Sequence, residues 1–181
     1  MKKGMIILED GFEQVEALAT HDVLRRTHNV QIDLVGGSKL QVATSSGVIV
    51  HANYVLKDIN PDEYDFIVLP GGKLGVDNLG SNPLVISLIH KFFKEGKHVH
   101  AICAAPYILG KLGYLNNKKY TCFPGFEDPS WGTYIDTGVV RDDNLITGHS
   151  MGYSVEFARE IVKLELGEQY LLGVDAGVFG K

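Results

Sequence analysis

Short apolar runs alternate along this chain with longer segments in which apolar residues recur at helical spacing. Compact runs of this length are typical of buried strands, and an apolar residue every three or four positions is typical of amphipathic helices. The predicted strands span residues 5–8, 31–35, 65–69, 99–102 and 145–147, and the predicted helices span 13–26, 83–95, 104–112 and 154–166. Alternation of this kind predicts βαβ units, and therefore an α/β fold with a mainly parallel sheet.

Two segments depart from the alternation. Residues 40–43 and 48–51 are strand-like and are separated by Thr-Ser-Ser-Gly, which predicts a hairpin. Residues 116–137 have no clear period and are rich in turn residues and aromatics. Because no internal repeat, low-complexity tract or linker interrupts the chain, we expect a single domain over residues 1–181.

Composition narrows the class of protein. The 181 residues are 45% hydrophobic, which is enough for a sizeable core, and the net charge of −5 comes from well-mixed acidic and basic residues. A basic stripe is missing, so we expect no nucleic-acid partner. No apolar run approaches the roughly 20 residues that cross a bilayer. The apolar run near Met1 is too short for a signal peptide and is followed by Glu9 and Asp10, so we expect a first strand and no membrane association.

Cys103 is the strongest candidate for chemistry. Residues 100–106 (His-Ala-Ile-Cys-Ala-Ala-Pro) take a buried strand directly into the cysteine and a helix directly out of it. This pattern is typical of a nucleophile elbow, in which small residues such as Ala101 and Ala105 relieve backbone crowding. The helix N-terminus favours the thiolate, so we expect a thiol pKa below the ordinary value of about 8.5. The alternative is a buried structural cysteine, which is a common fate for this residue.

Two further segments fall at carboxyl ends of predicted strands, where ligands bind in open α/β sheets. Gly71 and Gly72 follow residues 65–69, and their backbone N–H groups could serve an oxyanion hole; the alternative is an ordinary tight turn. Glu16 follows the first strand, and beside an apolar wall and a thiolate it would stay protonated and act as general acid and base. The alternative is a solvated acid in the first helical turn, which suits Glu13 better.

Together these motifs resemble the ThiJ/PfpI superfamily, in the DJ-1 branch that includes the Parkinsonism-associated deglycase and its bacterial relatives. The likeness runs from about residue 5 to residue 166 and rests on four segments. These are Gly11-x-Glu13-x-x-Glu16, Val68-Leu69-Pro70-Gly71-Gly72, Ala101-Ile102-Cys103-Ala104-Ala105-Pro106 and Ser154-Val155-Glu156-Phe157-Ala158. The resemblance implies a flavodoxin-like three-layer αβα sandwich, related to class I glutamine amidotransferases.

The resemblance also implies the roles of site residues. Cys103 would be the nucleophile and oxidation-sensitive thiol, Glu16 its protonated partner, and the N–H groups of Gly72 and Ala104 the oxyanion hole. Gly71, Phe123 and His149 would line the substrate site. Relatives act on α-oxoaldehydes such as methylglyoxal or on the adducts they form, need no cofactor, and are typically homodimers, so we expect the same here.

The chain departs from better-known members at several positions. Phe123 stands where some relatives place a histidine, and Ser46 and His149 stand where arginines often line the site, which puts anion binding in doubt. Ala104 follows the nucleophile where the protease-like branch has histidine. Without a base beside the thiol, peptide hydrolysis is disfavoured.

Other features carry weaker predictions. Cys122 could resolve an oxidised Cys103, although an inert core cysteine is the simpler interpretation. Two cysteines are too few for a disulfide framework, which favours a reducing, cytoplasmic setting. His98 and His100 share one strand face, but no third ligand can be named from the sequence, so we expect no metal site. The aromatics Phe123, Phe126, Trp131 and Tyr134 either cover the pocket or form a satellite core.

These observations favour a cysteine-dependent glyoxalase or deglycase. In that reaction Cys103 forms a hemithioacetal with an aldehyde and Glu16 moves the protons. The main alternative is a non-enzymatic oxidative-stress sensor or chaperone that uses an oxidisable Cys103. A biosynthetic role, suggested only by the superfamily's thiamine-pathway label, has no chemistry in these residues to support it.

Overall fold

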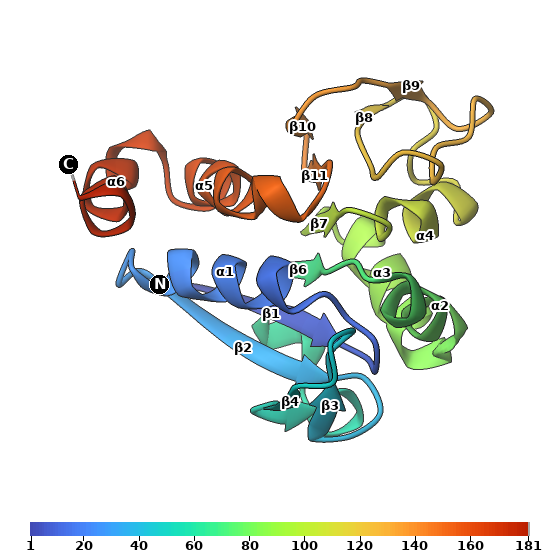
Figure 1. The fold of residues 1–181 in the computed structure, drawn as a ribbon, viewed down its shortest axis with the longest axis horizontal. Coiled ribbons are helices and arrows are strands. Elements are labelled where there is room, and N and C mark those ends of the chain that lie inside the picture. Colours follow the sequence, from blue (N-terminus) through green and yellow to red (C-terminus); the bar gives the residue numbers. More distant parts are fainter. Residues whose placement is uncertain (181) are drawn as a thin grey trace.

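The computed structural model describes residues 1–180, and its centre is a seven-stranded sheet (Figure 1). The strand order is β10-β11-β7-β6-β1-β2-β5. Every neighbouring pair is parallel except β10 and β11, which are antiparallel. The strands span Lys2–Leu8 (β1), Val30–Gly36 (β2), Tyr54–Val55 (β5), Phe66–Leu69 (β6), His98–Ile102 (β7), Val139–Asp142 (β10) and Leu145–Gly148 (β11). The prediction of a mainly parallel sheet is confirmed.

Helices cover both faces of this sheet because successive strand residues point to opposite sides. Met5 and Ile7 of β1 belong to one buried cluster, and Ile6 and Leu8 belong to the other. The first cluster is closed by α2 (Lys73–Ser81), α3 (Pro83–Lys94) and α4 (Pro106–Lys111). The second is closed by α1 (Gln14–Arg25), α5 (Ser154–Glu165) and the start of α6 (Leu171–Phe179). This is the expected three-layer sandwich.

Two small sheets decorate the sandwich. Strands β3 (Gln41–Ala43) and β4 (Ile49–His51) form the predicted antiparallel hairpin. In the segment expected to be irregular, β8 (Lys119–Tyr120) pairs with β9 (Thr133–Tyr134). Short 3₁₀ turns lie at Leu56–Asp58, Pro61–Glu63, Met151–Tyr153 and Glu168–Tyr170. Among residues 1–180, no helix has both the length and the apolarity that crossing a bilayer requires.

The structure corrects several element predictions. β1 begins at Lys2 rather than residue 5, and the helix predicted at 104–112 begins only at Pro106, because Cys103 to Ala105 form a turn. Helix α2 was not predicted, since its glycines resemble turn residues. Helix α6 was not predicted either, because it is apolar on nearly every side and its sequence therefore lacks the alternation of apolar and polar residues that marks an amphipathic helix. Strands β5 and β10 were also missed.

The topology decides where a ligand can bind. From β1 the chain passes to β2 on one side, and β6 and β7 then lie on the other side. Ligands in open α/β sheets bind where the strand order reverses, at the carboxyl ends of the strands. The first turns of α1 and α2 and the turn after β7 all meet at this edge.

Candidate active site

Cys103 lies in the tight turn that the sequence indicated, directly after β7. Its φ angle is +64°, in the left-handed region that non-glycine residues rarely occupy. Hydrogen bonds hold this conformation from both sides, since the Cys103 N–H donates to the Gly148 carbonyl (2.9 Å) and its carbonyl accepts from the Phe123 N–H (2.8 Å). Strained backbone of this kind is concentrated at functional sites, where surrounding contacts maintain it.

Gly71 and Gly72 bring backbone N–H groups against the cysteine. Gly72 has a φ of +87° and is the N-cap of α2, and its N–H and that of Ala104 both donate hydrogen bonds to the Cys103 sulfur. A Cβ on Gly71 would lie only 2.6 Å from Cys103 Cβ and 2.7 Å from Glu16 Oε2. Glycine is therefore required at position 71 by the close approach of the Cys103 and Glu16 side chains.

Glu16 is fully buried in the first turn of α1. Its Oε2 accepts a hydrogen bond of 2.7 Å from the Gly71 N–H, and its side chain is hydrogen-bonded to Cys103. Its Oε1 is buried and finds no hydrogen-bond partner within residues 1–180. Glu13 caps the helix instead, accepting from the Glu16 N–H at 3.0 Å. Glu16 is thus not the solvated first-turn acid of the alternative interpretation, whereas Glu13 has the capping role.

The ionisation of the pair differs from the sequence-based expectation. Burial raises the pKa of Glu16 from 4.5 to about 7. Burial, together with the charge of Glu16, raises the pKa of Cys103 to about 12, although the N–H groups of Gly72 and Ala104 oppose this increase. The expectation of a pKa below about 8.5 is wrong because it counted the N–H donors and the helix dipole but not desolvation.

Because the two groups are in hydrogen-bond contact, their protons belong to the pair. The pair loses its first proton near pH 7, the pKa of the more acidic group. The remaining proton can stand on Glu16 or on Cys103. When it stands on Glu16, burial still raises the pKa of the thiol, but the second cause, the negative charge of Glu16, is absent and two N–H donors face the sulfur. That arrangement provides a nucleophile and a neutral acid in contact.

An apolar cavity of about 440 Å³ opens over the pair. Cys103, Glu16, Gly72 and Ala104 belong to its wall, so the structure brings four of the predicted residues together. Phe123, whose side chain is 43% exposed, also lines it. The rest of the wall consists of Glu13, Lys73, Phe126, Ser150, Met151 and Gly152.

Other predicted residues lie outside this wall. His149 does not line the cavity; its ring contacts Ser150 Oγ at 3.1 Å and lies 3.5 Å from Asp136 Oδ1. Ser46 lies in the exposed turn between β3 and β4, where its hydroxyl donates a hydrogen bond of 2.6 Å to Gln14 Oε1. Gly71 does not line the cavity, although it lies against both Cys103 and Glu16.

The remaining candidates of the sequence analysis are Cys122 and the aromatic residues between positions 123 and 134. Cys122 is completely buried, and burial raises the pKa of its thiol to about 12, as expected for the inert alternative rather than for a resolving thiol. The aromatics divide: Phe123 and Phe126 line the cavity, whereas Trp131 and Tyr134 pack against Tyr120.

Two parts of the wall were not predicted from the sequence. Ser150, Met151 and Gly152 follow β11 at the same sheet edge. Their position after the carboxyl end of a strand is a signal that could have found them. Lys73 was missed because helix α2, which begins with it, was not predicted.

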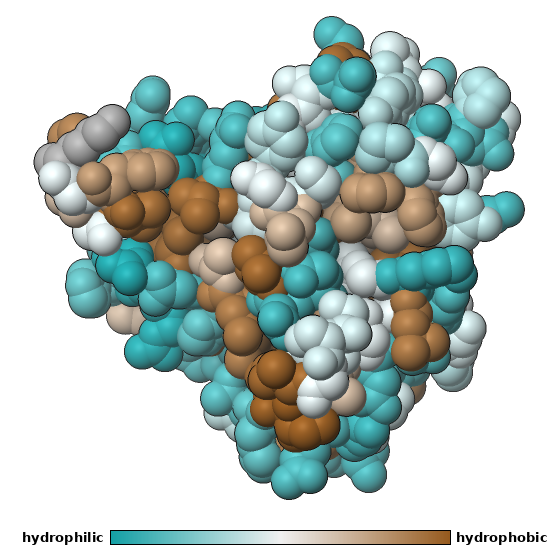
Figure 2. All heavy atoms as spheres, in the orientation of Figure 1, coloured by the Kyte–Doolittle hydropathy of each residue, from teal (hydrophilic) through white to brown (hydrophobic). Residues whose placement is uncertain are grey.

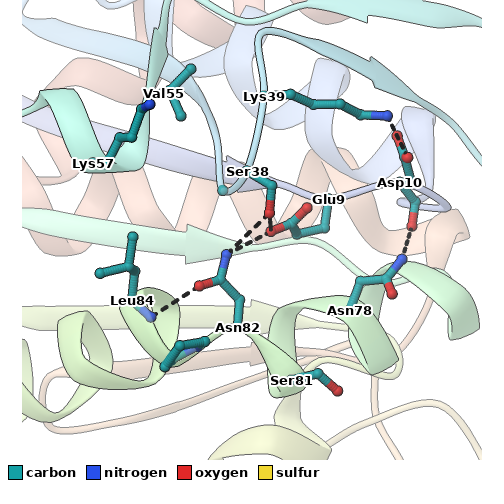
Figure 3. Close-up of a pocket in the computed structure, with 12 residues that line it drawn as sticks. Glu9, Asp10, Ser38, Lys39, Val55, Lys57, Asn78, Ser81, Asn82 and Leu84 are labelled. Atoms are coloured by element: carbon teal, nitrogen blue, oxygen red, sulfur yellow. Dashed lines mark hydrogen bonds and ion pairs between the residues drawn. The ribbon is translucent and has the colours of Figure 1, made fainter.

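A larger cavity, of about 610 Å³, lies elsewhere on this edge (Figure 3). Several of its polar groups already satisfy one another: Glu9 Oε1 accepts from Ser38 and from Asn82, both at 2.8 Å, and Lys39 pairs with Asp10. Neither a cysteine nor a histidine lines it. We therefore place the candidate reaction site in the smaller cavity above Cys103.

Comparisons with known proteins agree with this architecture. Residues 2–164 match the model of the DJ-1/PfpI family. The chain is 32% identical over 181 residues to protein dj-1beta of Drosophila melanogaster, covering 98% of this chain and 96% of the relative. It is 33% identical over 165 residues to a deglycase of Pyrococcus abyssi, covering 88% and 97%. It is also 35% identical over 168 residues to DJ-1 homolog B of Arabidopsis thaliana. This match covers 91% of the present chain but only 38% of the length of that relative.

Solved structures show the same fold. A DJ-1 superfamily protein of Salmonella typhimurium superposes with a TM-score of 0.92 at 30% identity, covering 99% of this chain and 98% of that one. Drosophila DJ-1beta superposes with a TM-score of 0.90 at 32% identity, covering 98% and 97%. The family model, the relatives and the cysteine turn agree, and the chain belongs to the DJ-1/PfpI family.

Proposed function

We propose that this protein is a cofactor-independent glyoxalase or deglycase that acts on α-oxoaldehydes such as methylglyoxal, or on the adducts they form with proteins. The observation that carries the proposal is the contact between a cysteine thiol and a buried carboxyl whose pKa is about 7, at the floor of an apolar cavity. A relative of Pyrococcus abyssi named as a deglycase supports the same class of reaction.

The first step is addition of the thiol to a carbonyl. With the pair's proton on Glu16, the Cys103 thiolate attacks the aldehyde carbon of methylglyoxal and forms the C–S bond of a hemithioacetal. Glu16 donates its proton to the developing oxyanion and becomes a carboxylate. The N–H groups of Gly72 and Ala104, which bond the sulfur in the free protein, lie where they can stabilise that negative charge.

The second step moves protons between adjacent carbons. The Glu16 carboxylate removes the proton from the carbon bound to sulfur, which leaves an enediolate. Glu16 returns this proton to the neighbouring carbon, the hydroxyl proton of the first carbon passes to the oxygen of the second, and a thioester of a 2-hydroxy acid remains. Water then cleaves the C–S bond, which releases lactate and restores the thiol. One carboxyl near neutral pKa can serve both transfers, because general acids and bases work best when their pKa lies near the operating pH.

The cavity wall suits a small neutral carbonyl compound. Lys73 is the only basic residue among the lining residues, and it is bonded to Asp77 at 3.0 Å. The arginines that often line the family's site have no equivalent at Ser46 or His149. Ala104, rather than a histidine, follows Cys103, and no histidine of residues 1–180 lines the cavity, so peptide hydrolysis remains disfavoured.

We also propose that the protein works as a homodimer in a reducing compartment such as the cytoplasm. Val48 and Ile49 of the hairpin are 52% and 60% exposed, and Val15 and Leu18 of α1 are 40% and 37% exposed. Figure 2 shows a hydrophobic patch over the β3–β4 hairpin. Apolar surface of this kind favours pairing across a two-fold axis. Both cysteines are free thiols, which suits a reducing compartment.

The experiment that tests the reaction is incubation of purified protein with a large excess of methylglyoxal. Our proposal predicts many molecules of lactate per protein chain without added glutathione or metal. A redox sensor or chaperone would instead consume at most a stoichiometric amount of aldehyde, and that outcome would contradict the proposal.

A further inference from the structure

A cluster of three metal-ligating side chains lies at the opposite end of β7 from Cys103. His98 and His100 are two residues apart on this strand, so both side chains stand on the same sheet face. Glu165, the last residue of α5, packs against them from the helix layer. The sequence offered no third ligand for the two histidines; the fold supplies one from a position 65 residues beyond His100.

The donor atoms converge on one point. Glu165 Oε1 lies 2.5 Å from His98 Nδ1 and 3.3 Å from His100 Nε2. One donor atom from each residue lies within 4.8 Å of the others. Ligands of a tetrahedral zinc ion, bound at about 2.0–2.2 Å, are separated by roughly 3.3 Å. The three groups therefore reach coordination distances with side-chain shifts of about 1 Å.

The hydrogen bonding within the cluster is incomplete. Both histidine contacts use Glu165 Oε1, while Oε2 is buried and has no hydrogen-bond partner within residues 1–180. Lys2 Nζ lies 3.8 Å from Oε2, beyond hydrogen-bond distance. The His100 side chain is fully buried and its Nδ1 is also without a partner in this part of the chain. Buried polar atoms normally find hydrogen-bond partners, and Oε2 has only the longer ion pair with Lys2, so this oxygen can still bind an ion.

An ion can reach the cluster from one side. The His98 side chain is 26% exposed, whereas His100 and Glu165 are closed off by the core. Entry past His98 would leave room for water as a fourth ligand, as in zinc sites with three protein ligands.

We propose that His98, His100 and Glu165 bind a borderline transition-metal ion of the Zn²⁺ class. Two imidazole nitrogens and one carboxylate suit Zn²⁺ or Co²⁺, whereas Ca²⁺ and Mg²⁺ require mainly oxygen ligands. At about 3.3 Å per residue, His100 is roughly 10 Å and His98 roughly 16 Å along the strand from Cys103. The ion would fasten the end of α5 to β7 and would take no part in the proposed reaction.

The test is titration of the metal-free, full-length protein with Co²⁺ and Zn²⁺. A Cys103→Ser background removes the competing thiolate. We expect one Co²⁺ per chain, visible absorption bands of a tetrahedral ion, and displacement by Zn²⁺. At Zn²⁺ one hundred times the dissociation constant, the melting temperature should rise by about 5–10 °C.

Matched variants in the same background locate the site. His98→Asn, at a partly exposed position, should weaken binding at least about 100-fold, because it removes a ligand. Glu165→Gln should weaken metal binding to the same extent, and circular dichroism verifies that this variant folds. If it does not fold, the affinity of His98→Asn alone tests the site. As a control, His28→Asn changes an exposed histidine outside the cluster. This variant should bind the metal ion with the same affinity as the Cys103→Ser protein. Absence of saturable micromolar binding, or equal affinity in His98→Asn and His28→Asn, would overturn the proposal.

Discussion

Replacement of Glu16 by glutamine is the sharpest perturbation that the pair offers. The amide is nearly isosteric with the carboxyl, and its oxygen can still accept the 2.7 Å hydrogen bond from Gly71 N–H. It cannot give and then take a proton. General acid–base groups contribute about 10²–10⁴ in rate, and here one group serves both transfers. We therefore expect Glu16→Gln to lose about 10⁴-fold in turnover, which corresponds to about 5.5 kcal/mol of barrier.

The same substitution has a calculable effect on stability. The pKa of Glu16 is about 7 in the folded protein and 4.5 in the reference state. Between these values the unfolded chain releases the proton while the folded chain retains it, so stability falls as pH rises from about 4.5 to 7 and levels off above. The difference corresponds to about 3 kcal/mol. Glutamine does not titrate, and so the variant should gain about 3 kcal/mol relative to wild type between pH 4 and pH 8.

Lactate formation and urea unfolding at several pH values, on the same preparations, measure both effects. Circular dichroism verifies that the variant is folded. Retained turnover in a folded Glu16→Gln variant would leave Cys103 without its acid–base partner and would favour the redox-sensor alternative. A pH-independent stability difference would show that the carboxyl does not titrate near pH 7 in the fold.

Three further predictions follow from the site and the surface. Gly71→Ala should lower turnover by about 100-fold or more in a folded protein, because the new methyl group would displace Cys103 and Glu16 from contact; unchanged kinetics would contradict the close approach. Mild peroxide should oxidise Cys103 before the completely buried Cys122, and peptide mass spectrometry showing the reverse order would refute this assignment. Light scattering should give twice the chain mass of 19.9 kDa, and Ile49→Lys should shift the protein towards the monomer; a monomeric wild type would refute the dimer.

Much of the fold could be predicted from the chain because the strands are short, apolar and regularly separated. The elbow at Cys103 was also visible locally, since a strand, small residues and a helix follow one another there. Helix α2 was hidden because Gly72, Gly75 and Gly80 suggest turns, although α2 packs Val76 and Leu79 into the core.

The electrostatics of the site could not be read from sequence. The dipole and N–H donors at Cys103 are local features, but the desolvation that outweighs them depends on packing by distant segments. In the same way, the third ligand for His98 and His100 comes from α5, and no local pattern connects Glu165 to β7. His149 was expected in the wall because of its place in the family pattern, whereas its neighbour Ser150 takes that place.

The central claim, that Cys103 is a catalytic nucleophile, is tested most directly by comparing lactate formation from methylglyoxal in three proteins. These are the wild type, Cys103→Ser and, as a matched control, Cys122→Ser. We predict that wild type and Cys122→Ser turn over many times, and that Cys103→Ser forms no lactate above the uncatalysed background. Equal lactate formation by wild type and a folded Cys103→Ser variant would contradict the account.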